Sequence, residues 1–370
     1  MITRYGYGRP CKSIEIIEAG HPIPDLSGLQ ATRRMLDLLN TSDTETFVLA
    51  LISGGASALL VQPIEPITLA EKREFTEALL ASGAPIQILN VIRKAISRVK
   101  GGQLAAAAYP AKVLGLIISD VPGDDPALIG SGPTVVDSST AGQALSYLTN
   151  WKIKAPKSVL NVLVAKEQAA TTVSALLSKV ENVIVAAPSQ SLLAAAAMAR
   201  EADCEVISLG DAVKGEASIV AIEHATRALS IQNSMKPYAK PIVLLSGGEL
   251  TVTRRGNGIG GPNAEYMLAM AIALGGAREI SGIACDTDGV DGVAEVAGAV
   301  IDETTLRRAV ELGLYAQSAL RNNDAHTFFH GLGDQIVTGP TLTNVNDFRA
   351  ILISPKVANH GNDKEPPALG

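Results

Sequence analysis

Cysteine is scarce in this 370-residue sequence. The three cysteines, Cys11, Cys204 and Cys285, are widely spaced, and they form no Cys-x-x-Cys pair and have no neighbouring histidine. An odd number of such residues excludes a disulfide framework, and their spacing excludes a structural zinc site. We therefore expect reduced and mostly buried thiols.

Aromatic residues and clusters of positive charge are also few. Aromatics make up 4% of the sequence, the net charge is -6, and no run of lysine and arginine could follow a phosphate backbone. These features argue against a nucleic-acid partner. No segment approaches the ~20 consecutive apolar residues that a membrane span needs, and the N-terminus lacks an apolar signal region. The sequence predicts a cytoplasmic protein and leaves a homodimer open.

The residues that are abundant indicate an α/β protein. Hydrophobic residues make up 47% of the chain, and Ala, Val, Ile, Leu and Gly dominate, which is typical of strands covered on both faces. Short apolar runs alternate with segments of helical spacing, which favours a doubly wound parallel sheet. The length favours two domains, which we assign to residues 1–165 and 166–356. Residues 357–370 are polar and are predicted to form a loose tail.

One glycine-rich loop has the spacing of a dinucleotide-binding motif. The segment RGNGIGG satisfies G-x-G-x-x-G at Gly256, Gly258 and Gly261, after a predicted strand and before a predicted helix that starts at Pro262. An isolated match of this kind is more often a turn that only reverses the chain. The two preceding arginines and the aspartates that follow favour an anion site.

Three aspartates follow the next apolar run. Asp286, Asp288 and Asp291 lie in the segment DTDGVDG, which fails the EF-hand pattern because its fifth, sixth and twelfth positions are occupied by Val290, Asp291 and Ala297. A magnesium site that uses one or two carboxylates together with substrate phosphates fits the residue types. A cluster of Asx turns fits them equally well.

Polar residues also follow two predicted strands of the first domain. Asp120 ends the run KVLGLIISD, and Ser53, Gly54, Gly55 and Ser57 follow the run FVLALI. Ligands of open α/β sheets bind beyond the carboxyl ends of the strands, where a carboxylate can accept a proton from a substrate hydroxyl. The alternative for Asp120 is a cap on the following turn.

Two basic residues precede a pair of glycines. Lys100 is followed by Gly101 and Gly102, and Arg93 lies seven residues earlier on roughly the same helical face. They could meet an anionic substrate or could be solvated surface charge. We interpret His21 as structural and the pair His326 and His330 as local packing.

Taken together, the motifs resemble one family, the glycerate 2-kinases with a MOFRL domain, formerly labelled hydroxypyruvate reductases. The matching segments are ITRYGYG, EAGHPIPD, LISGGASALL, NVIRKAISRVKGGQLA, ISDVPGDDPALIGSGPT, LSGGELTV, GNGIGGPNAE, DTDGVDG, RNNDAH and TGPTLTNVND. They occur in the family's order over nearly the whole chain. The resemblance implies an N-terminal Rossmann-like parallel sheet with helices on both faces, a C-terminal α/β domain of MOFRL type, and a cleft between them.

The resemblance also implies a reaction. The γ-phosphoryl group of ATP would pass to the 2-hydroxyl of D-glycerate, with Asp120 as catalytic base and Mg²⁺ bridging the phosphates. The residues expected to bind the substrate are Ser53, Gly54, Gly55, Ser57, Arg93 and Lys100, and those expected to hold Mg²⁺ are Asp286, Asp288 and Asp291. Those expected to bind ATP, partly through backbone N–H groups, are Gly248, Glu249, Gly258, Gly260, Gly261, Asn263, Glu265, Asn323 and Asp324.

The sequence departs from the family pattern in two places. Family members begin with a further strand and helix bearing a catalytic lysine in a Gly-Lys-Ala motif, and this sequence starts after that region. Pro262 occupies a position where some members carry an arginine assigned to catalysis, and proline has neither a charge nor an N–H donor. We expect a truncated or degenerate copy in which the absent strand leaves a sheet edge or core face exposed, and in which Arg254 or Arg255 could compensate for Pro262.

Two other functions compete with the kinase. A nicotinamide-dependent hydroxypyruvate reductase needs an acidic residue about 20 positions after the glycines. Glu279 precedes the next strand instead of ending it, and Asp286 belongs to the acidic triplet. The other alternative is a catalytically inactive protein that binds a sugar acid or nucleotide. The sequence has no Walker motif, so a kinase would need another phosphate-binding element.

Overall fold

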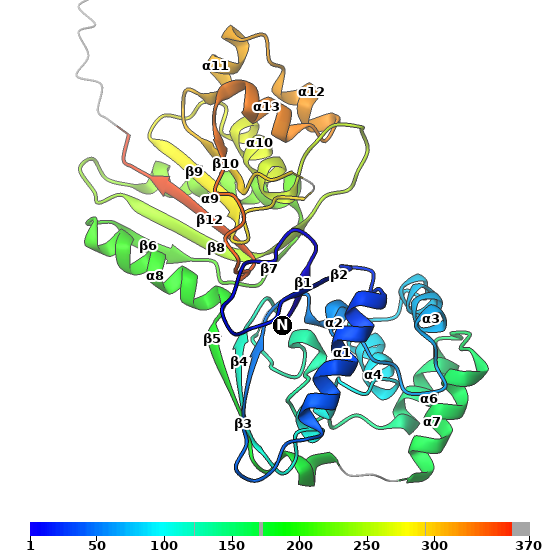
Figure 1. Cartoon of the computed structure of the whole chain (residues 1–370). Helices are drawn as coiled ribbons and strands as arrows, with labels where there is room; N and C mark the ends of the chain where they lie inside the picture. The colour runs from blue at the N-terminus through cyan, green and yellow to red at the C-terminus, as the bar shows by residue number, and fades with distance from the viewer. Residues whose placement is uncertain (122, 170–172, 293, 357–370) are drawn as a thin grey trace, which may run out of the picture. The chain divides into compact units, whose positions relative to one another are not determined.

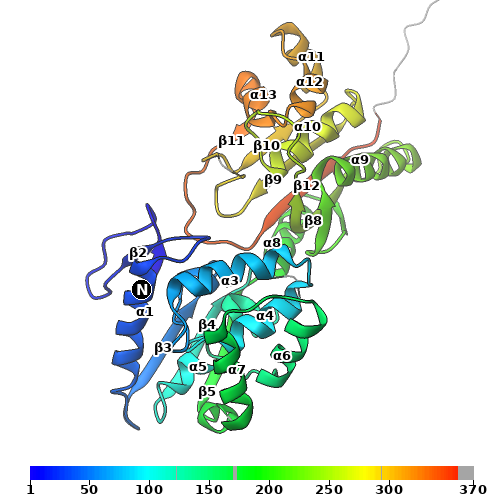
Figure 2. The same cartoon turned by 90° about the vertical axis from the view of Figure 1, so that its right-hand side faces the viewer.

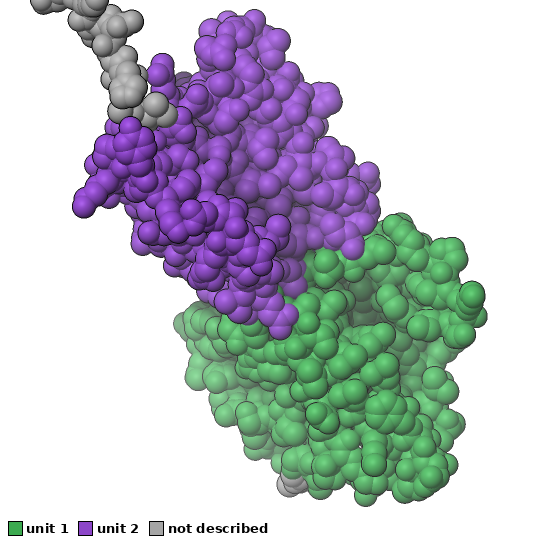
Figure 3. Space-filling view, turned by 90° about the vertical axis from the view of Figure 1, so that its left-hand side faces the viewer, with its two compact units in different colours: residues 1–187, 342–344 green, residues 188–341, 345–370 purple. Residues whose placement is uncertain are grey.

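The computed structural model describes residues 1–121, 123–169, 173–292 and 294–356, so the predicted tail lies outside the described residues. The chain forms two compact units (Figure 3): unit 1 contains residues 1–187 and 342–344, and unit 2 contains residues 188–341 and the chain from 345 onward. The predicted boundary at residue 165 falls inside helix α7 (Lys157–Ala169). The structure divides the chain later, between Ala187 and Pro188, because the strand that follows α7 belongs to the sheet of unit 1.

A parallel three-stranded sheet forms the centre of unit 1. Its strands are β3 (Phe47–Ile52), β4 (Lys112–Ile118) and β5 (Val180–Ala186), in the order β3-β4-β5. A separate parallel pair joins β1 (Ile2–Arg4) to β2 (Ile17–Ala19). The other helices of this unit are α1 (Leu26–Leu39), α2 (Ala56–Leu59), α3 (Leu69–Ala81), α4 (Ile86–Ala95), α5 (Gln103–Ala106) and α6 (Ala141–Asn150), with short 3-10 turns at Ile129–Ser131 and Val173–Leu177.

Local signals in the sequence set several helix boundaries. The Thr68 hydroxyl accepts a hydrogen bond from the Glu71 N–H at 3.2 Å, and the Glu71 carboxylate accepts one from the Thr68 N–H at 2.9 Å, so a capping box starts α3. Asp25 caps α1 by accepting from the Gly28 N–H at 2.9 Å. Helix α3 packs against α4 (Figure 2), and both bury an apolar face in the same core cluster.

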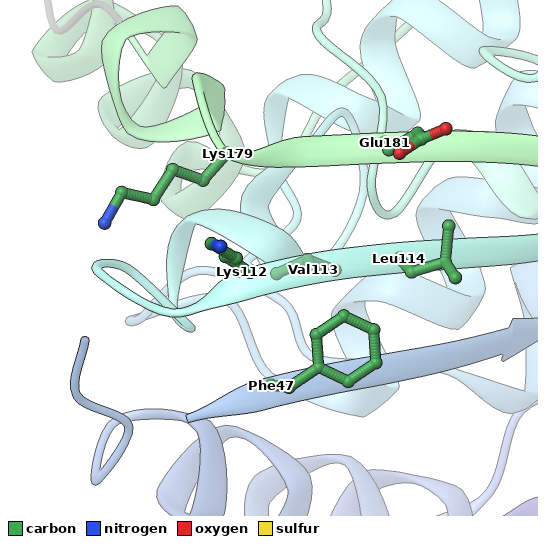
Figure 4. A pocket seen from close by; sticks show the side chains of 6 residues that line it. All are labelled: Phe47, Lys112, Val113, Leu114, Lys179 and Glu181. Atoms are coloured by element: carbon green, nitrogen blue, oxygen red, sulfur yellow. The ribbon is translucent and has the colours of Figure 1, made fainter. Parts of the chain in front are cut away.

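The two faces of the unit 1 sheet have different environments. Ile52, Val113 and Ile117 point into the core, whereas the alternate residues of β3, Phe47, Leu49 and Leu51, are 61%, 51% and 62% exposed. The described helices of unit 1 lie on one side of the sheet (Figure 1). Figure 4 shows Phe47 and Leu114 side by side on the other face. Helices on both faces were predicted; within the described residues of unit 1, the structure corrects this to one covered face.

Unit 2 contains a mixed sheet. Its described strands run in the order β11-β10-β9-β12-β8-β6, and β7 also pairs with β8. Strand β12 (Asp347–Ile353) is antiparallel to both β8 (Ile242–Thr251) and β9 (Ile280–Asp286). The remaining strands are β6 (Glu205–Ser208), β7 (Val213–Glu216), β10 (Gly298–Ile301) and β11 (Gln335–Ile336).

Helices cover both faces of this second sheet. Leu244 of β8 packs in a cluster with α9 (Ala217–Ser234) and α10 (Pro262–Leu274), whereas Leu245 packs with α8 (Pro188–Glu201) on the opposite face. Helix α10 is buried around most of its circumference, which explains its uniformly apolar sequence. The shorter helices α11 (Thr305–Glu311), α12 (Ala316–Arg321) and α13 (Ala325–Leu332) complete the unit.

The three cysteines differ in how far they are buried. Cys11 is exposed, which corrects the expectation of mostly buried thiols, and Cys204 and Cys285 are partly buried. Burial, together with the carboxylates of Asp286, Asp347 and Asp291, raises the pKa of the Cys285 thiol to about 11. Of the helices in the described residues, none has the length and apolar character needed to cross a membrane.

Candidate functional site

The loop after β3 and the residue after β4 come together in unit 1, as their positions in the sequence predict. Ile52 pairs with Ile117 in the parallel register, so both strands end at the same edge of the sheet. A Cβ atom on Gly54 would overlap the Asp120 carboxylate. Glycine at this position therefore lets the carboxylate approach the loop backbone. Burial raises the pKa of Asp120, although its own backbone N–H and the His21 charge act in the opposite direction.

His21 belongs to the same neighbourhood, which the sequence interpretation missed. Its Nε2 would lie 3.2 Å from a Cβ atom on Gly55, a residue in the left-handed region at φ +79°. Partial desolvation lowers the pKa of His21, and the charge of Arg4 lowers it further, while Asp120 raises it. His21 is thus neutral near pH 7 and lies in the electrostatic field of Asp120. The only sequence signal for it was its position between Gly20 and Pro22.

A basic pocket lies around Ser57, three residues beyond Gly54. The Arg93 Nη2 donates to the Ser57 hydroxyl at 2.8 Å, and the Lys100 Nζ donates to the Ser57 carbonyl oxygen at 2.7 Å. Ser57 and Ser131 hydroxyls are 2.8 Å apart. The sequence predicted Arg93, Lys100 and Ser57 as one group, and the structure brings them together. Because Lys100 is 2% exposed, its alternative as solvated surface charge is excluded.

The cations of this pocket have no carboxylate partner. Within the described residues, Arg93 and Lys100 form no ion pair, and the buried Nε of Arg93 has no hydrogen-bond acceptor. Burial lowers the pKa of Lys100 well below its usual range, and the charges of Arg93 and Lys72 lower it further. The neighbouring Lys94, in contrast, pairs with Asp137 at 2.7 Å. Buried positive charge without a partner is the usual environment of a bound anion.

The glycine loop of unit 2 is held by the turn that precedes α13. The Asn323 Oδ1 accepts hydrogen bonds from the N–H groups of Arg255 and Gly256 at 2.7 and 3.0 Å. The neighbouring Asn322 accepts from Asn257 and Gly258, and the Asp324 carboxylate accepts from Ile259. Of the glycines predicted to contact ATP, Gly258 thus has its N–H group bonded to an acceptor of the chain itself.

Close packing explains why this loop is rich in glycine. A Cβ atom on Gly258 would lie 2.7 Å from the Asn322 carbonyl oxygen, and one on Gly260 would lie 2.9 Å from that of Asn323. A Cβ atom on Gly261 would overlap Asp291. The glycines therefore allow the loop to lie against the chain itself. A contact between these residues and ATP stays a prediction.

Asp291 has a structural partner in the first turn of α10. Its carboxylate accepts hydrogen bonds from the backbone N–H groups of Asn263 and Ala264 at 2.9 and 2.8 Å, which is how a carboxylate stabilises a helix N-terminus. His326 Nε2 lies 3.3 Å from the same carboxylate. Burial alone would lower the pKa of His326, but its hydrogen bonds and Coulombic attraction to Asp291 raise it.

The other two predicted metal ligands, Asp286 and Asp288, lie in a strongly acidic environment. Burial raises the pKa of Asp286, and the charges of Asp288 and Asp347 raise it further. No group of three or more acidic, histidine or cysteine side chains forms a ready metal cage among the described residues. The oxygen donors of Asp286 and Asp288 still fit Mg²⁺, which takes one or two carboxylates and completes its shell with water and phosphate. The triplet as a metal site remains a prediction.

A buried ion pair supports this acidic region. Arg349 is 1% exposed, and its guanidinium donates to the Asp347 carboxylate at 2.9 Å and to the Gly247 carbonyl oxygen at 2.5 Å. The Asn263 side-chain amide donates to the other Asp347 oxygen at 2.7 Å. Asn263, predicted to contact ATP, is thus hydrogen-bonded to two aspartates of its own unit, and Glu265 accepts from Asn323 at 2.9 Å.

Gly248 and Glu249 lie inside β8 instead of in a loop beyond it. Gly248 has φ +102°, and a Cβ atom there would collide with the backbone of Val213 in β7. Glycine at this position therefore allows β7 and β8 to pair closely. Glu249 is exposed.

Comparison with known proteins identifies the family. A model described as a domain of unknown function (DUF4147) matches residues 1–164, and the MOFRL family model matches residues 242–347. A D-glycerate 2-kinase of Thermotoga maritima is 37% identical over 348 residues, which cover 94% of this chain and 82% of that protein. A crystal structure of a glycerate kinase from the same organism matches with a TM-score of 0.88 at 37% identity, covering 95% of this chain and 84% of that one. This chain belongs to the glycerate 2-kinase family.

The family assignment confirms the resemblance predicted from the motifs and the α/β class of both parts of the chain. The unit 1 site, from Ser53 to Asp120, lies within the region matched by the first model, and the glycine loop and acidic triplet lie within the MOFRL region. A protein of Agrobacterium vitis named "Putative hydroxypyruvate reductase" is 47% identical over 355 residues, covering 95% of this chain and 80% of that protein. Both names therefore occur among relatives of this glycerate 2-kinase family member.

Proposed function

We propose that this chain transfers the γ-phosphoryl group of ATP to the 2-hydroxyl of D-glycerate, giving 2-phosphoglycerate. The observation that supports this most is the basic pocket around Ser57, which has no acidic partner among the described residues and lies three residues from the loop that contacts Asp120. In D-glycerate the carboxylate is attached to the carbon that carries the 2-hydroxyl. Arg93 and Lys100, which contact Ser57, thus lie near the carboxylate, and Asp120, which lies against Gly54, is the base for the adjacent hydroxyl.

Asp120 acts as the general base. Its raised pKa makes the carboxylate a stronger proton acceptor than a solvated aspartate. It accepts the proton of the 2-hydroxyl as that oxygen attacks the γ-phosphorus. Arg93 and Lys100 hold the carboxylate and fix the orientation of the hydroxyl, which is the main contribution a protein makes to phosphoryl transfer.

Mg²⁺ would neutralise charge on the phosphates of the bound nucleotide, and Asp286 and Asp288 are the residues that would hold it. The charge of Asp288 helps to raise the pKa of Asp286, and a bound cation would offset the repulsion between these two carboxylates, which supports this assignment. Asp291 is assigned mainly to the start of α10, because both of its carboxylate oxygens accept helix N–H groups. A cytoplasmic location and a homodimer remain part of the proposal.

The reductase is the weaker candidate. Its strongest support in the sequence was the G-x-G-x-x-G match, but a dinucleotide fold needs such glycines to open the backbone toward a pyrophosphate. Here the N–H groups of the loop are bonded to Asn322, Asn323 and Asp324. The glycine spacing therefore does not support binding of a nicotinamide cofactor.

The purified chain should convert D-glycerate and Mg·ATP to 2-phosphoglycerate and ADP, with the product detected by phosphorus NMR. The same preparation should not oxidise NADH or NADPH in the presence of hydroxypyruvate. Hydride transfer without phosphoryl transfer would replace the kinase by the reductase. Binding of both D-glycerate and Mg·ATP with no product from either reaction would establish the inactive homologue, for which Pro262 in place of an arginine is the supporting observation.

A further inference from the structure

Helix α3 carries a lysine on its buried face. Leu69, Lys72, Phe75 and Leu79 are its buried residues, at the three- and four-residue spacing of a stripe that faces the core. Lys72 is 8% exposed. Lysine is among the residues least often buried, because removing an ammonium from water is costly unless it is paired. An apolar residue at this position would serve the packing of α3 better.

The Lys72 ammonium has no partner that would explain this burial. In the part of the chain that the structure describes, it forms no ion pair and no side-chain hydrogen bond. The charges that act on it are those of Arg93 and Arg73, both positive. Burial, together with the charges of these two arginines, lowers the pKa of Lys72 to about 8. Arg73 itself donates to the Pro24 carbonyl oxygen.

Lys72 belongs to the pocket around Ser57. Helix α3, which carries Lys72, packs against α4, which carries Arg93, and the two helices bury residues in one core cluster. The charge of Lys72 also acts on Lys100, and that of Arg93 acts on both lysines, so the three cations share one buried region. They come from α3, α4 and the segment after α4. Arg93 also retains a buried Nε without an acceptor. Three mutually repelling cations with spare donors form a stable arrangement only when an anion is bound among them.

We propose that Lys72 is a third substrate-binding residue of this pocket, which pairs with the carboxylate of the sugar acid and selects anionic over neutral polyols. This proposal rests on the proposed function for the identity of the substrate. Arg93 and Lys100 each donate hydrogen bonds to Ser57, whereas the Lys72 ammonium has all its donors available. Lys72 therefore contributes to affinity and specificity, and Asp120 performs the proton transfer.

The test uses the full chain with Lys72→Met, which keeps the length of the side chain and removes the charge. Lys157→Met, an exposed residue at the start of α7, is the matched control. Lys72→Met should raise the KM and Kd for D-glycerate about tenfold or more, as expected for loss of a charge-assisted contact. Its KM for ATP and its affinity for the neutral analogue glycerol should not change. The melting temperature of Lys72→Met should be higher than that of the wild type. The substitution removes a buried cation that has no partner and is repelled by neighbouring arginines.

The outcomes separate the two proposals. Unchanged D-glycerate affinity in Lys72→Met, or an equal loss of affinity for glycerol, overturns the assignment of Lys72. A fall in melting temperature equally overturns it, because a lysine with a structural role would stabilise the fold. Should the wild type not phosphorylate D-glycerate, the proposed function fails. In that case, titration with inorganic phosphate tests whether Lys72 binds an anion. Phosphate binding by the wild type and by Lys157→Met, but not by Lys72→Met, supports the assignment of Lys72. Equal binding by all three proteins, or binding by none of them, overturns that assignment.

Discussion

At the residue scale, the role proposed for Asp120 as general base predicts how activity depends on pH. The carboxylate must be ionised to accept a proton, and burial raises its pKa above the usual 3.8. Activity should therefore fall as the pH is lowered through this raised pKa, at a higher pH than for an exposed aspartate. Burial lowers the pKa of His21, so this residue becomes protonated at a lower pH than an ordinary histidine. Its protonation at low pH would add a positive charge near Asp120.

Replacement of Asp120 by asparagine should separate catalysis from stability. Asp120→Asn should lower kcat by about 10²-fold or more, the usual contribution of a general base. Stability at pH 7 should be unchanged or higher, because the raised pKa means that folding disfavours the ionised carboxylate. This difference in stability should shrink at acidic pH, because the wild-type carboxyl is then protonated and no longer pays the cost of burying a charge. Steady-state kinetics measure kcat, and thermal unfolding from pH 4 to 8 measures stability. A large loss of stability of Asp120→Asn at pH 7 would show that Asp120 is chiefly a turn cap.

Sequence reasoning found some of these residues and missed others for identifiable reasons. Asp120 and Ser57 follow apolar strand-forming runs, so the rule that ligands bind beyond strand ends located them. Lys72 lies on α3, and the apolar period of a helix shows only which of its positions face inward. The period does not reveal which other charges converge on such a position. His21 precedes α1 and approaches Gly55 through tertiary packing.

At the scale of elements, the glycine loop from Gly256 to Gly261 shows how one pattern can serve two purposes. The spacing that matches a nucleotide-binding fingerprint also suits a loop packed against another turn. The sequence could not distinguish them, because the partner turn at Asn322–Asp324 lies some sixty residues away, as the contact between Asn257 and Asn322 shows. The mixed sheet of unit 2 was hidden for the same reason: β12 inserts between β8 and β9 only through non-local pairing. Apolar runs and helical periods predicted the individual elements well.

Replacement of Gly258 by alanine tests this interpretation of the loop. Its Cβ atom would press on the Asn322 backbone, and relief requires the loop to move, at a cost of about 1–3 kcal/mol for overpacking. The amide of Gly258, which donates to the Asn322 carbonyl oxygen at 2.9 Å, should then exchange with solvent much faster.

The control is Gly142→Ala in the first turn of α6. There the new Cβ atom meets only the flexible end of the exposed Glu167 side chain, and alanine favours a helix over glycine. Its stability should be nearly unchanged. Denaturant unfolding and amide exchange provide the comparison. Equal stability of the two variants, with unchanged exchange at residue 258, would mean that the loop is not held by the turn.

At the scale of the whole molecule, the residues assigned to the sugar acid and those assigned to the metal nucleotide belong to different compact units. Arg93, Lys100 and Asp120 lie in unit 1, and Asp286 and Asp288 lie in unit 2. Each unit has its own hydrophobic clusters and its own sheet. A substitution in one site should therefore leave the other site folded, so that the binding of the two ligands can be impaired separately.

Reciprocal variants test this separation. Arg93→Met should weaken D-glycerate binding about tenfold or more and leave the Kd for Mg·ATP unchanged, because it removes a charged donor from unit 1 only. Asp286→Asn should weaken Mg·ATP binding and leave the Kd for D-glycerate unchanged, because it removes a proposed Mg²⁺ ligand from unit 2. Each ligand is titrated alone by calorimetry, and kcat should fall in both variants, since the reaction needs both ligands. Loss of both affinities in either variant would show that one ligand is held by residues of both units, and the division of roles would then have to be redrawn.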